Sequence, residues 1–252
     1  MTEPRQGYAL ARLAARHGAP GRAGERAALS ASRGADRYLD VLRQTRLLAP
    51  PESVTAHDLD AFELYLLGAW RAACEEVASW HPPRWRAAYR WCACLADLPV
   101  LESLRTPVPA SGWLSGDPTL APLGSAPPAQ RAAALAAAGL GPLAAAFDAG
   151  ESLAQAWRAH WRALWPVAGG STARRLGELE ALCRADAAGD ATGAERRAQL
   201  AERLERLYRR SRGSAAAGFC ELARRALDLE TWRGGFASRL YRQASAPADT
   251  PS

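Results

Sequence analysis

Apolar residues recur every three to four positions along most of this chain, the spacing at which side chains share one face of an α-helix. The longest such run predicts a helix over residues 57–80, with Thr55 or Asp58 as its capping residue. Its apolar positions are Leu59, Phe62, Leu66, Ala69, Trp70, Ala73 and Val77. No segment alternates with period two over more than a few residues, and β-branched residues are scarce. We therefore expect an all-α fold, with helical lobes packed as a funnel-like or irregular helical bundle.

Similar runs predict further helices along the rest of the chain. A helix should begin at Pro82-Pro83, because proline is tolerated in the first turn, where N–H groups lack an intrahelical partner. This helix is apolar on two faces, so it should be buried, and Pro99 should bend it or start a new one. The other helices are expected over 7–17, 36–48, 129–138, 151–165, 172–188 and 214–241, with one more from Thr192 onward and a short one from Gly141. Gly234-Gly235 should weaken the last helix near its end.

The stretch from Thr106 to Pro128 interrupts this pattern with six prolines and three glycines. Both residue types disfavour helix interiors, so the composition is typical of a long connection. We predict one or more N-terminal helical lobes over 1–105, a Pro-rich connection over 106–128 and a C-terminal helical lobe over 129–242. Residues 243–252 should form a disordered tail.

The basic residues are unusual because all 32 of them are Arg and the chain contains no Lys. Asn and Ile are also absent, and all three missing amino acids use A- and T-rich codons, so the pattern is typical of a GC-rich genome. The formal net charge of +6 therefore does not by itself indicate phosphate recognition. The absence of Lys excludes a P-loop lysine and a Schiff-base lysine.

The apolar runs and the cysteines bear on the cellular location of the protein. The longest apolar run, 132–147, is shorter than the ~20 residues needed to cross a bilayer, so we expect no transmembrane span. The five cysteines are an odd number, and the first six residues lack an apolar signal region. We therefore expect reduced thiols in a cytoplasmic protein.

The residues that could carry chemistry do not form a recognisable catalytic or metal motif. Cys92 and Cys94 are the most metal-like pair, but side chains two positions apart on a helix point ~200° apart, so we expect buried structural thiols. His160 has the most site-like setting of the four histidines, yet no carboxylate lies three or four residues away to orient it. The stripe Trp157, Trp161 and Trp165 is expected in the core. We predict no catalytic activity, no metal and no cofactor.

One candidate for partner binding is an arginine-rich segment. Residues 196–212 hold seven Arg against two Glu. The candidate partner-binding residues are Arg196, Arg197, Arg203, Arg206, Arg209 and Arg210. The segment could be a solvated face with Glu202–Arg206 and Glu205–Arg209 pairs, or it could dock on an acidic protein surface, anionic lipid or nucleic acid. Nucleic acid is not expected, because only Tyr208 is placed to stack on a base.

A short phrase in the tryptophan-rich middle of the chain resembles a known family. Asp97, Leu98, Leu101, Leu104 and Arg105 are similar to an Asp-Leu-x-x-Leu-x-x-Leu-Arg phrase that ends a helix in the central-stalk socket subunit of rotary V/A-type ATPases, called d in eukaryotes and C in archaeal-type enzymes. Segments 8–12, 36–48 and 226–235 resemble the family more loosely. Pro99 and Val100 depart from the phrase, which typically has Asn in this region.

The resemblance implies a shortened bacterial member of that family and a non-catalytic role. Such a subunit is a funnel of helical lobes that couples the rotor shaft to the membrane ring during proton or sodium transport. It implies partners among the other ATPase subunits and a cytoplasmic location peripheral to the inner membrane. The alternative from the residues alone is a soluble helical adaptor or regulatory protein.

Overall fold

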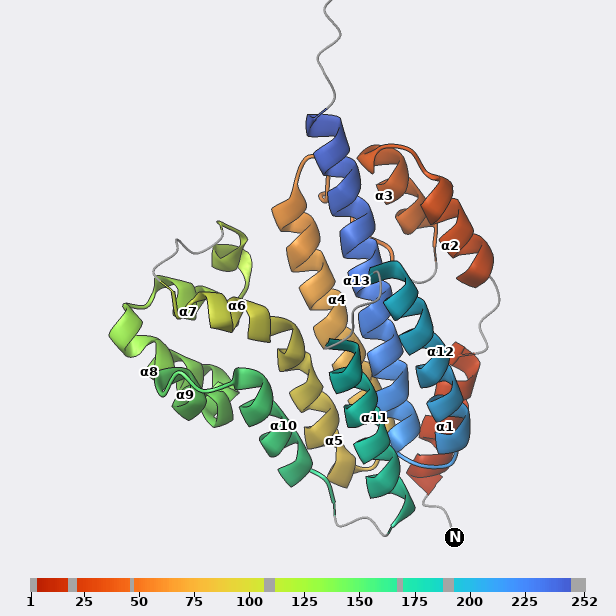
Figure 1. The fold of residues 1–252 in the computed structure, drawn as a ribbon, viewed down its shortest axis with the longest axis vertical. Coiled ribbons are helices and arrows are strands. Elements are labelled where there is room, and N and C mark those ends of the chain that lie inside the picture. The colour runs from red at the N-terminus through yellow and green to blue at the C-terminus, as the bar shows by residue number, and fades with distance from the viewer. Residues whose placement is uncertain are drawn as a thin grey trace, which may run out of the picture.

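The computed structural model describes residues 4–17, 22–45, 48–106, 112–166, 170–187 and 193–245. Every regular element within these ranges is helical, which confirms the expected all-α fold (Figure 1). None of the helices in this part of the chain combines the length and the apolarity needed to cross a bilayer.

The helices divide into those before and those after the connection around residues 106–120. The first half contains α1 (Pro4–His17), α2 (Arg22–Ala31), α3 (Ala35–Gln44), α4 (Leu59–Trp80), α5 (Pro83–Trp91) and α6 (Leu98–Ser103). The second half contains α7 (Ala121–Ser125), α8 (Arg131–Leu135), α9 (Gly141–Asp148), α10 (Leu153–Ala163), α11 (Ser171–Ala187), α12 (Gly193–Ser211) and α13 (Ala216–Ala244). Short 3₁₀ segments are η1 (Cys92–Asp97), η2 (Gly112–Gly116) and η3 (Pro128–Gln130), and η4 (Ala136–Leu140) is a π segment.

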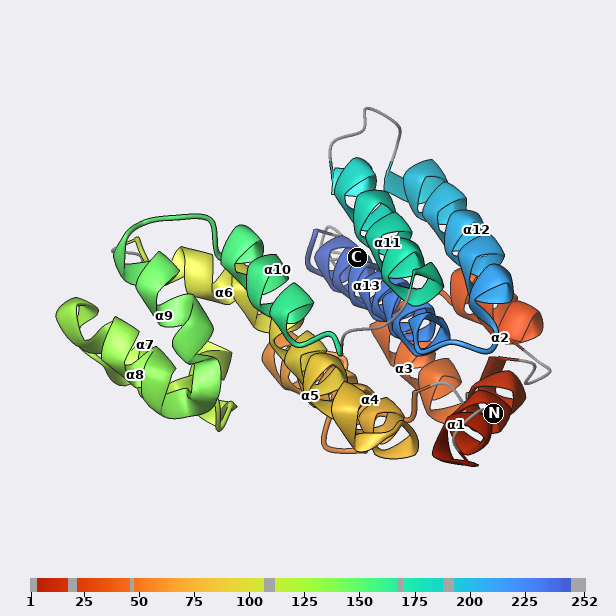
Figure 2. The ribbon, with the colours of Figure 1, turned by 90° about the horizontal axis from the view of Figure 1, so that it is seen from below.

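The two ends of the sequence meet in one group of helices. Helix α13 lies beside α4 and also packs against α1, α3, α11 and α12 (Figure 1). The ring of Phe62 on α4 meets that of Phe236 on α13 with centroids 4.4 Å apart. Helices α6 to α10 lie together on the other side of α5 (Figure 2). The helices therefore group differently from the expected lobes over 1–105 and 129–242, because the chain leaves the first group, builds the second and returns.

The starts of the central helices follow the predicted signals. Asp58 caps α4, since its carboxylate accepts a hydrogen bond of 2.8 Å from the N–H of Ala61. Helix α5 begins at Pro83, and Pro99 lies in the first turn of α6. The chain passes from α5 to α6 through η1 rather than through a continuous helix, so Pro99 starts a new helix as expected.

The proline-rich stretch 106–128 is not a bare connection. Residues 112–125 include η2 and α7, and their buried leucines Leu114, Leu120 and Leu123 belong to the same core as α4 and α13. Asp117 is also buried and accepts backbone N–H groups at the start of the next turn. The prolines here begin short helices, a use that composition alone does not distinguish from a linker. The remainder, 107–111, lies outside the described residues.

Two glycines let tyrosines approach the backbone of α13. At Gly235, an added Cβ would collide with the ring of Tyr38, whose hydroxyl donates a 3.3 Å hydrogen bond to the carbonyl of Trp232. At Gly218, it would collide with Tyr89, whose hydroxyl donates to the carbonyl of Ala215. Helix α13 continues through Gly234-Gly235 to Ala244, so the glycines do not end it. The first two residues of the expected tail are helical, and 246–252 lie outside the described part.

A buried arginine ties α13 to the end of α2. The guanidinium of Arg239 donates to the carbonyls of Leu29 and Ser32 at 3.0 Å each, and it lies 4.4 Å from the ring centroid of Tyr38. The last carbonyls of a helix have no intrahelical partner, and a cation there also complements the helix dipole. Arg239 therefore adds donors to the carbonyls at the end of α2, where that of Leu29 also accepts from the hydroxyl of Ser32 at 2.7 Å.

We expect Gly235→Ala to lower the free energy of unfolding by about 1–3 kcal/mol, because the methyl group would push Tyr38 away from α13. The neighbouring Gly234→Ala is the matched control. It meets nothing within 4 Å and should stabilise α13 by up to about 1 kcal/mol. Urea unfolding measures both variants, and equal effects would contradict the close contact.

Candidate functional site

The residues of the Asp97–Arg105 phrase form a joint between the two groups of helices. Leu98, Leu101 and Leu104 are buried. Arg105 extends to the second group, where it donates to the carbonyls of Ala146 and Glu151 at 2.7 and 2.6 Å. The structure thus brings the five phrase residues to one place and gives each a packing or bonding role.

Asp97 takes part in a buried charge cluster at this joint. Arg71 on α4 donates to Asp97 at 2.8 Å and to Asp117 at 2.5 Å, and both carboxylates are only 2% exposed. Burial raises the pKa of Asp97, against the opposing effect of Arg71. One guanidinium therefore holds α4, η1 and the turn after η2 together, and its removal would leave two buried carboxylates unpaired.

Indole N–H groups complete the joint by binding carbonyls where α5 changes into η1. Trp70 donates to the carbonyls of Cys92 and Ala93 at 3.1 and 3.0 Å. Trp91 and Trp157 each donate to the other's carbonyl, at 3.1 and 3.2 Å. These bonds cross from α4 and α10 to the same short segment. The tryptophans thus stabilise an irregular backbone as well as filling the core.

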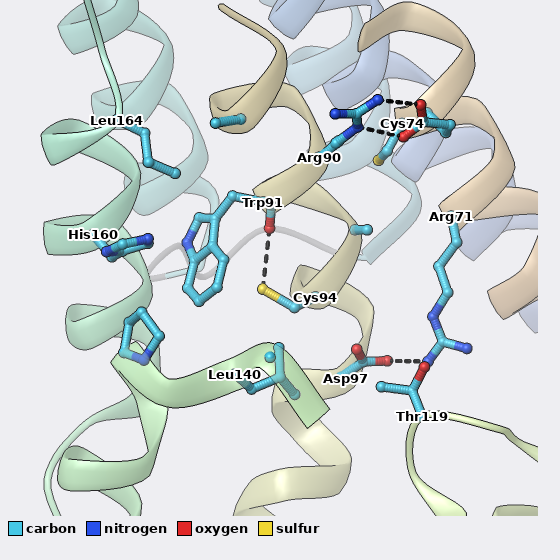
Figure 3. Close-up of a pocket in the computed structure, with 15 residues that line it drawn as sticks. Arg71, Cys74, Arg90, Trp91, Cys94, Asp97, Thr119, Leu140, His160 and Leu164 are labelled. Atoms are coloured by element: carbon cyan, nitrogen blue, oxygen red, sulfur yellow. Dashed lines mark hydrogen bonds and ion pairs between the residues drawn. The ribbon is translucent and has the colours of Figure 1, made fainter. Parts of the chain in front are cut away.

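A cavity of about 570 Å³ opens beside the joint (Figure 3). Its wall includes Trp91 and His160, whose rings meet edge to face at 4.5 Å, and Cys94 and Asp97 on η1 (Figure 3). The cavity is also lined by Arg71, Cys74, Glu75, Arg90, Thr119, Leu140 and Leu164. Arg90 and Glu75 form a solvent-exposed ion pair at the rim. The cavity therefore combines an aromatic wall with charges that are already paired.

The cavity lacks an activated nucleophile and an oriented base among its lining residues. Burial raises the pKa of Cys74, and it raises that of Cys94 to about 12, so both thiols stay protonated at neutral pH. The ring of His160 packs against Trp91, and no carboxylate that lines the cavity binds it. Its site-like sequence setting is a packing position in the fold.

Cys92 and Cys94 are both buried, as expected from the sequence. Cys92 donates through its Sγ to the carbonyl of Ala88, and Cys94 donates to that of Trp91. Both lie in a 3₁₀ segment, and no group of His, Cys, Asp and Glu in the described ranges is arranged to hold a metal ion.

Sequence reasoning missed a histidine that the fold places between two carboxylates. His17, at the end of α1, lies 2.8 Å from Glu205 on α12 and 3.4 Å from Glu221 on α13. Its ring stacks on Tyr208 at 3.9 Å. Hydrogen bonding to Glu221 and to Glu205 raises the pKa of His17, although burial opposes this. No local signal could have found the cluster, because its acids lie far from His17 in the sequence.

A second histidine has the opposite electrostatics. His81 is fully buried, neither ring nitrogen has a hydrogen-bond partner in the described structure, and its ring stacks on Tyr89 at 4.4 Å. Burial lowers the pKa of His81 to about 4, so the ring is neutral near pH 7. It serves as a flat packing surface rather than as a base.

The candidate partner-binding arginines separate into two places. Arg203, Arg206, Arg209 and Arg210 line a groove between α11 and α12 together with Leu182. Arg197 instead faces a cavity between α2, α12 and α13, and Arg196 is half-buried. The expected pairs Glu202–Arg206 and Glu205–Arg209 form, at 3.8 and 2.7 Å. The groove is therefore the part of the segment where arginines converge.

No family model, curated protein or solved structure matches this chain. The resemblance to a rotary ATPase subunit stays a hypothesis based on the residues of the phrase.

We expect Arg71→Ala to lower the free energy of unfolding by about 3–5 kcal/mol at neutral pH, because two carboxylates would remain buried and unpaired. Acidification should recover part of this loss as Asp97, whose pKa burial raises, becomes protonated. Arg90→Ala is the control on the same cavity, and losing its exposed pair should cost less than about 1 kcal/mol. Urea unfolding at several pH values measures both, and a small loss in Arg71→Ala would contradict the joint.

His17 should stabilise the protein more at pH 6 than at pH 9. Its pKa is raised in the folded state, so its contribution is present below the unfolded value of 6.5 and is lost as pH rises through the folded pKa. We expect His17→Gln to destabilise by about 1 kcal/mol or more at pH 6 and by less at pH 9. The difference in unfolding free energy between the unsubstituted protein and His17→Gln, measured with urea at each pH, isolates this effect. The titration of His81 is common to both proteins and cancels in the difference. A pH-independent difference would contradict the ion pairs.

Proposed function

We propose that this chain is a non-catalytic subunit of a rotary V/A-type ATPase that couples the rotor shaft to the membrane ring during ion transport. The observation that carries the proposal is the role of the phrase Asp97–Arg105. Its residues, which resemble the socket-subunit family, hold the two groups of helices together. A part that transmits torque needs a stiff joint of this kind.

The way polar groups are used supports a mechanical role. Charged side chains at the joint are paired across helices, as in the Arg71 cluster, and buried thiols are kept protonated by burial. Glu180 on α11 is likewise buried and paired with Arg162 of α10 at 2.6 Å. These contacts resist relative movement of helices, and none of them leaves a reactive group aimed at a substrate.

In this proposal the chain sits on the cytoplasmic face of the inner membrane and is held there by neighbouring subunits. The shaft and the ring are the proposed partners.

Affinity purification from detergent-solubilised membranes tests the assignment. A tagged copy, expressed in the organism that encodes the protein, should recover ring and shaft subunits, which mass spectrometry would identify. Recovery from the soluble fraction alone, without ATPase subunits, would overturn the assignment and favour a soluble helical adaptor.

A second measurement tests the coupling role. Arg105→Gln removes the charge that binds the carbonyls of Ala146 and Glu151, so the joint should soften. We expect the complex to assemble with a lower ratio of ion pumping to ATP hydrolysis in membrane vesicles. The control Arg90→Gln, on an exposed pair outside the joint, should leave the ratio unchanged. Equal ratios in both variants would contradict a coupling role for the joint.

A further inference from the structure

The groove between α11 and α12 has basic walls and an apolar floor. It measures about 660 Å³ and is lined by Leu182 from α11 and by Arg203, Arg206, Arg209 and Arg210 from α12. All four arginines are exposed. The four arginines line this recess, and three of them, Arg206, Arg209 and Arg210, also pair with the glutamates Glu202, Glu205 and Glu178.

These arginines can be redirected at little cost. Arg206 and Arg210 pair with Glu202 and Glu178 at 3.8 and 3.3 Å, and each of these arginines is more than 60% exposed. Such exposed pairs contribute about 0–1 kcal/mol each, so a better-placed carboxylate can replace them. Arg203 makes no ion pair with any described residue.

We propose that this groove binds an acidic helical segment of a partner protein. Arg203, Arg206 and Arg210 are three and then four residues apart, so they share one face of α12 and span about 10 Å along it. Carboxylates with the same spacing on another helix match that row, and each can accept two parallel N–H bonds from a guanidinium. Leu182 offers a floor for one apolar side chain between them.

Two other polyanions fit this groove less well. A flat membrane surface would not reach into a recess. A single-stranded nucleic acid would find no exposed aromatic ring in the groove for its bases to stack on, because Tyr208 is buried beneath His17. Charge and shape together favour a peptide. Binding of an acidic helix in this groove does not depend on which assembly the chain joins.

Fluorescence anisotropy with the purified full chain tests the proposal. The probe is a fluorescein-labelled, alanine-based helical peptide with Glu at positions i, i+3 and i+7 and one Leu between them. Its control has Gln at the same three positions. We expect the Glu peptide to bind, the Gln peptide to bind at least about tenfold more weakly, and added salt to weaken binding of the Glu peptide.

Paired variants locate the site. Arg203→Ala/Arg206→Ala should weaken binding of the Glu peptide by about tenfold or more. The control Arg33→Ala/Arg37→Ala removes the same charge from exposed positions around the start of α3 and should leave the affinity unchanged. Circular dichroism and thermal unfolding verify that both variants fold, and the single variant Arg203→Ala should show the same direction of change.

Several results would overturn the proposal. They are equal binding of the Glu and Gln peptides, equal losses in the two double variants, or no binding at low salt. Tighter, Arg203-dependent binding to phosphatidylserine vesicles or to a single-stranded oligonucleotide would assign the groove to lipid or nucleic acid instead. None of these results bears on co-purification with ATPase subunits, so the groove and the proposed assembly can fail separately.

Discussion

Close packing of tyrosines on the backbone of α13 is the constraint on which the first group of helices depends. Gly218 and Gly235 leave room for Tyr89 and Tyr38, and each tyrosine hydroxyl binds the carbonyl three residues before the glycine, at the start of α13 or within it. The two contacts fix the depth and the rotation of α13 between α3, α4 and α5. Its aromatic residues then fill the space beside α4, and Arg239 reaches the end of α2. A bulkier residue at either glycine would disturb all of these contacts together.

The joint compensates for the loss of regular helical hydrogen bonding where α5 becomes η1. Indole N–H groups and one buried guanidinium satisfy the polar groups in that segment. Since each donor comes from another helix, satisfying the backbone also fixes how the second group of helices sits on the first. The same contacts that stabilise the fold are therefore those that would carry force between its parts.

Local pattern predicted most of the helices, but it missed α2 and α7 and did not reveal the contacts between helices. The spacing of Leu59, Phe62 and Leu66 predicts α4, and Asp58 and Pro83 mark helix starts by chemistry that acts within one turn. The proline-rich stretch could not be assigned from composition, because prolines are common both in linkers and at helix starts. The His17 cluster could not be predicted, since its acids come from α12 and α13 and no short-range pattern connects them. The arginine groove was foreseen as a basic segment, but only the partner helix α11 shows which arginines converge.

The return of the chain has a consequence for biosynthesis. The side chains that complete the first group, among them Trp232 and Phe236, belong to α13, which is translated after the other described helices. Until α13 has been translated, the apolar face of α4 lacks its cover, whereas α5 to α10 are contiguous and can pack earlier. The nascent protein therefore passes through a stage with an open hydrophobic surface, at which a chaperone can hold it and a premature stop leaves an aggregation-prone fragment.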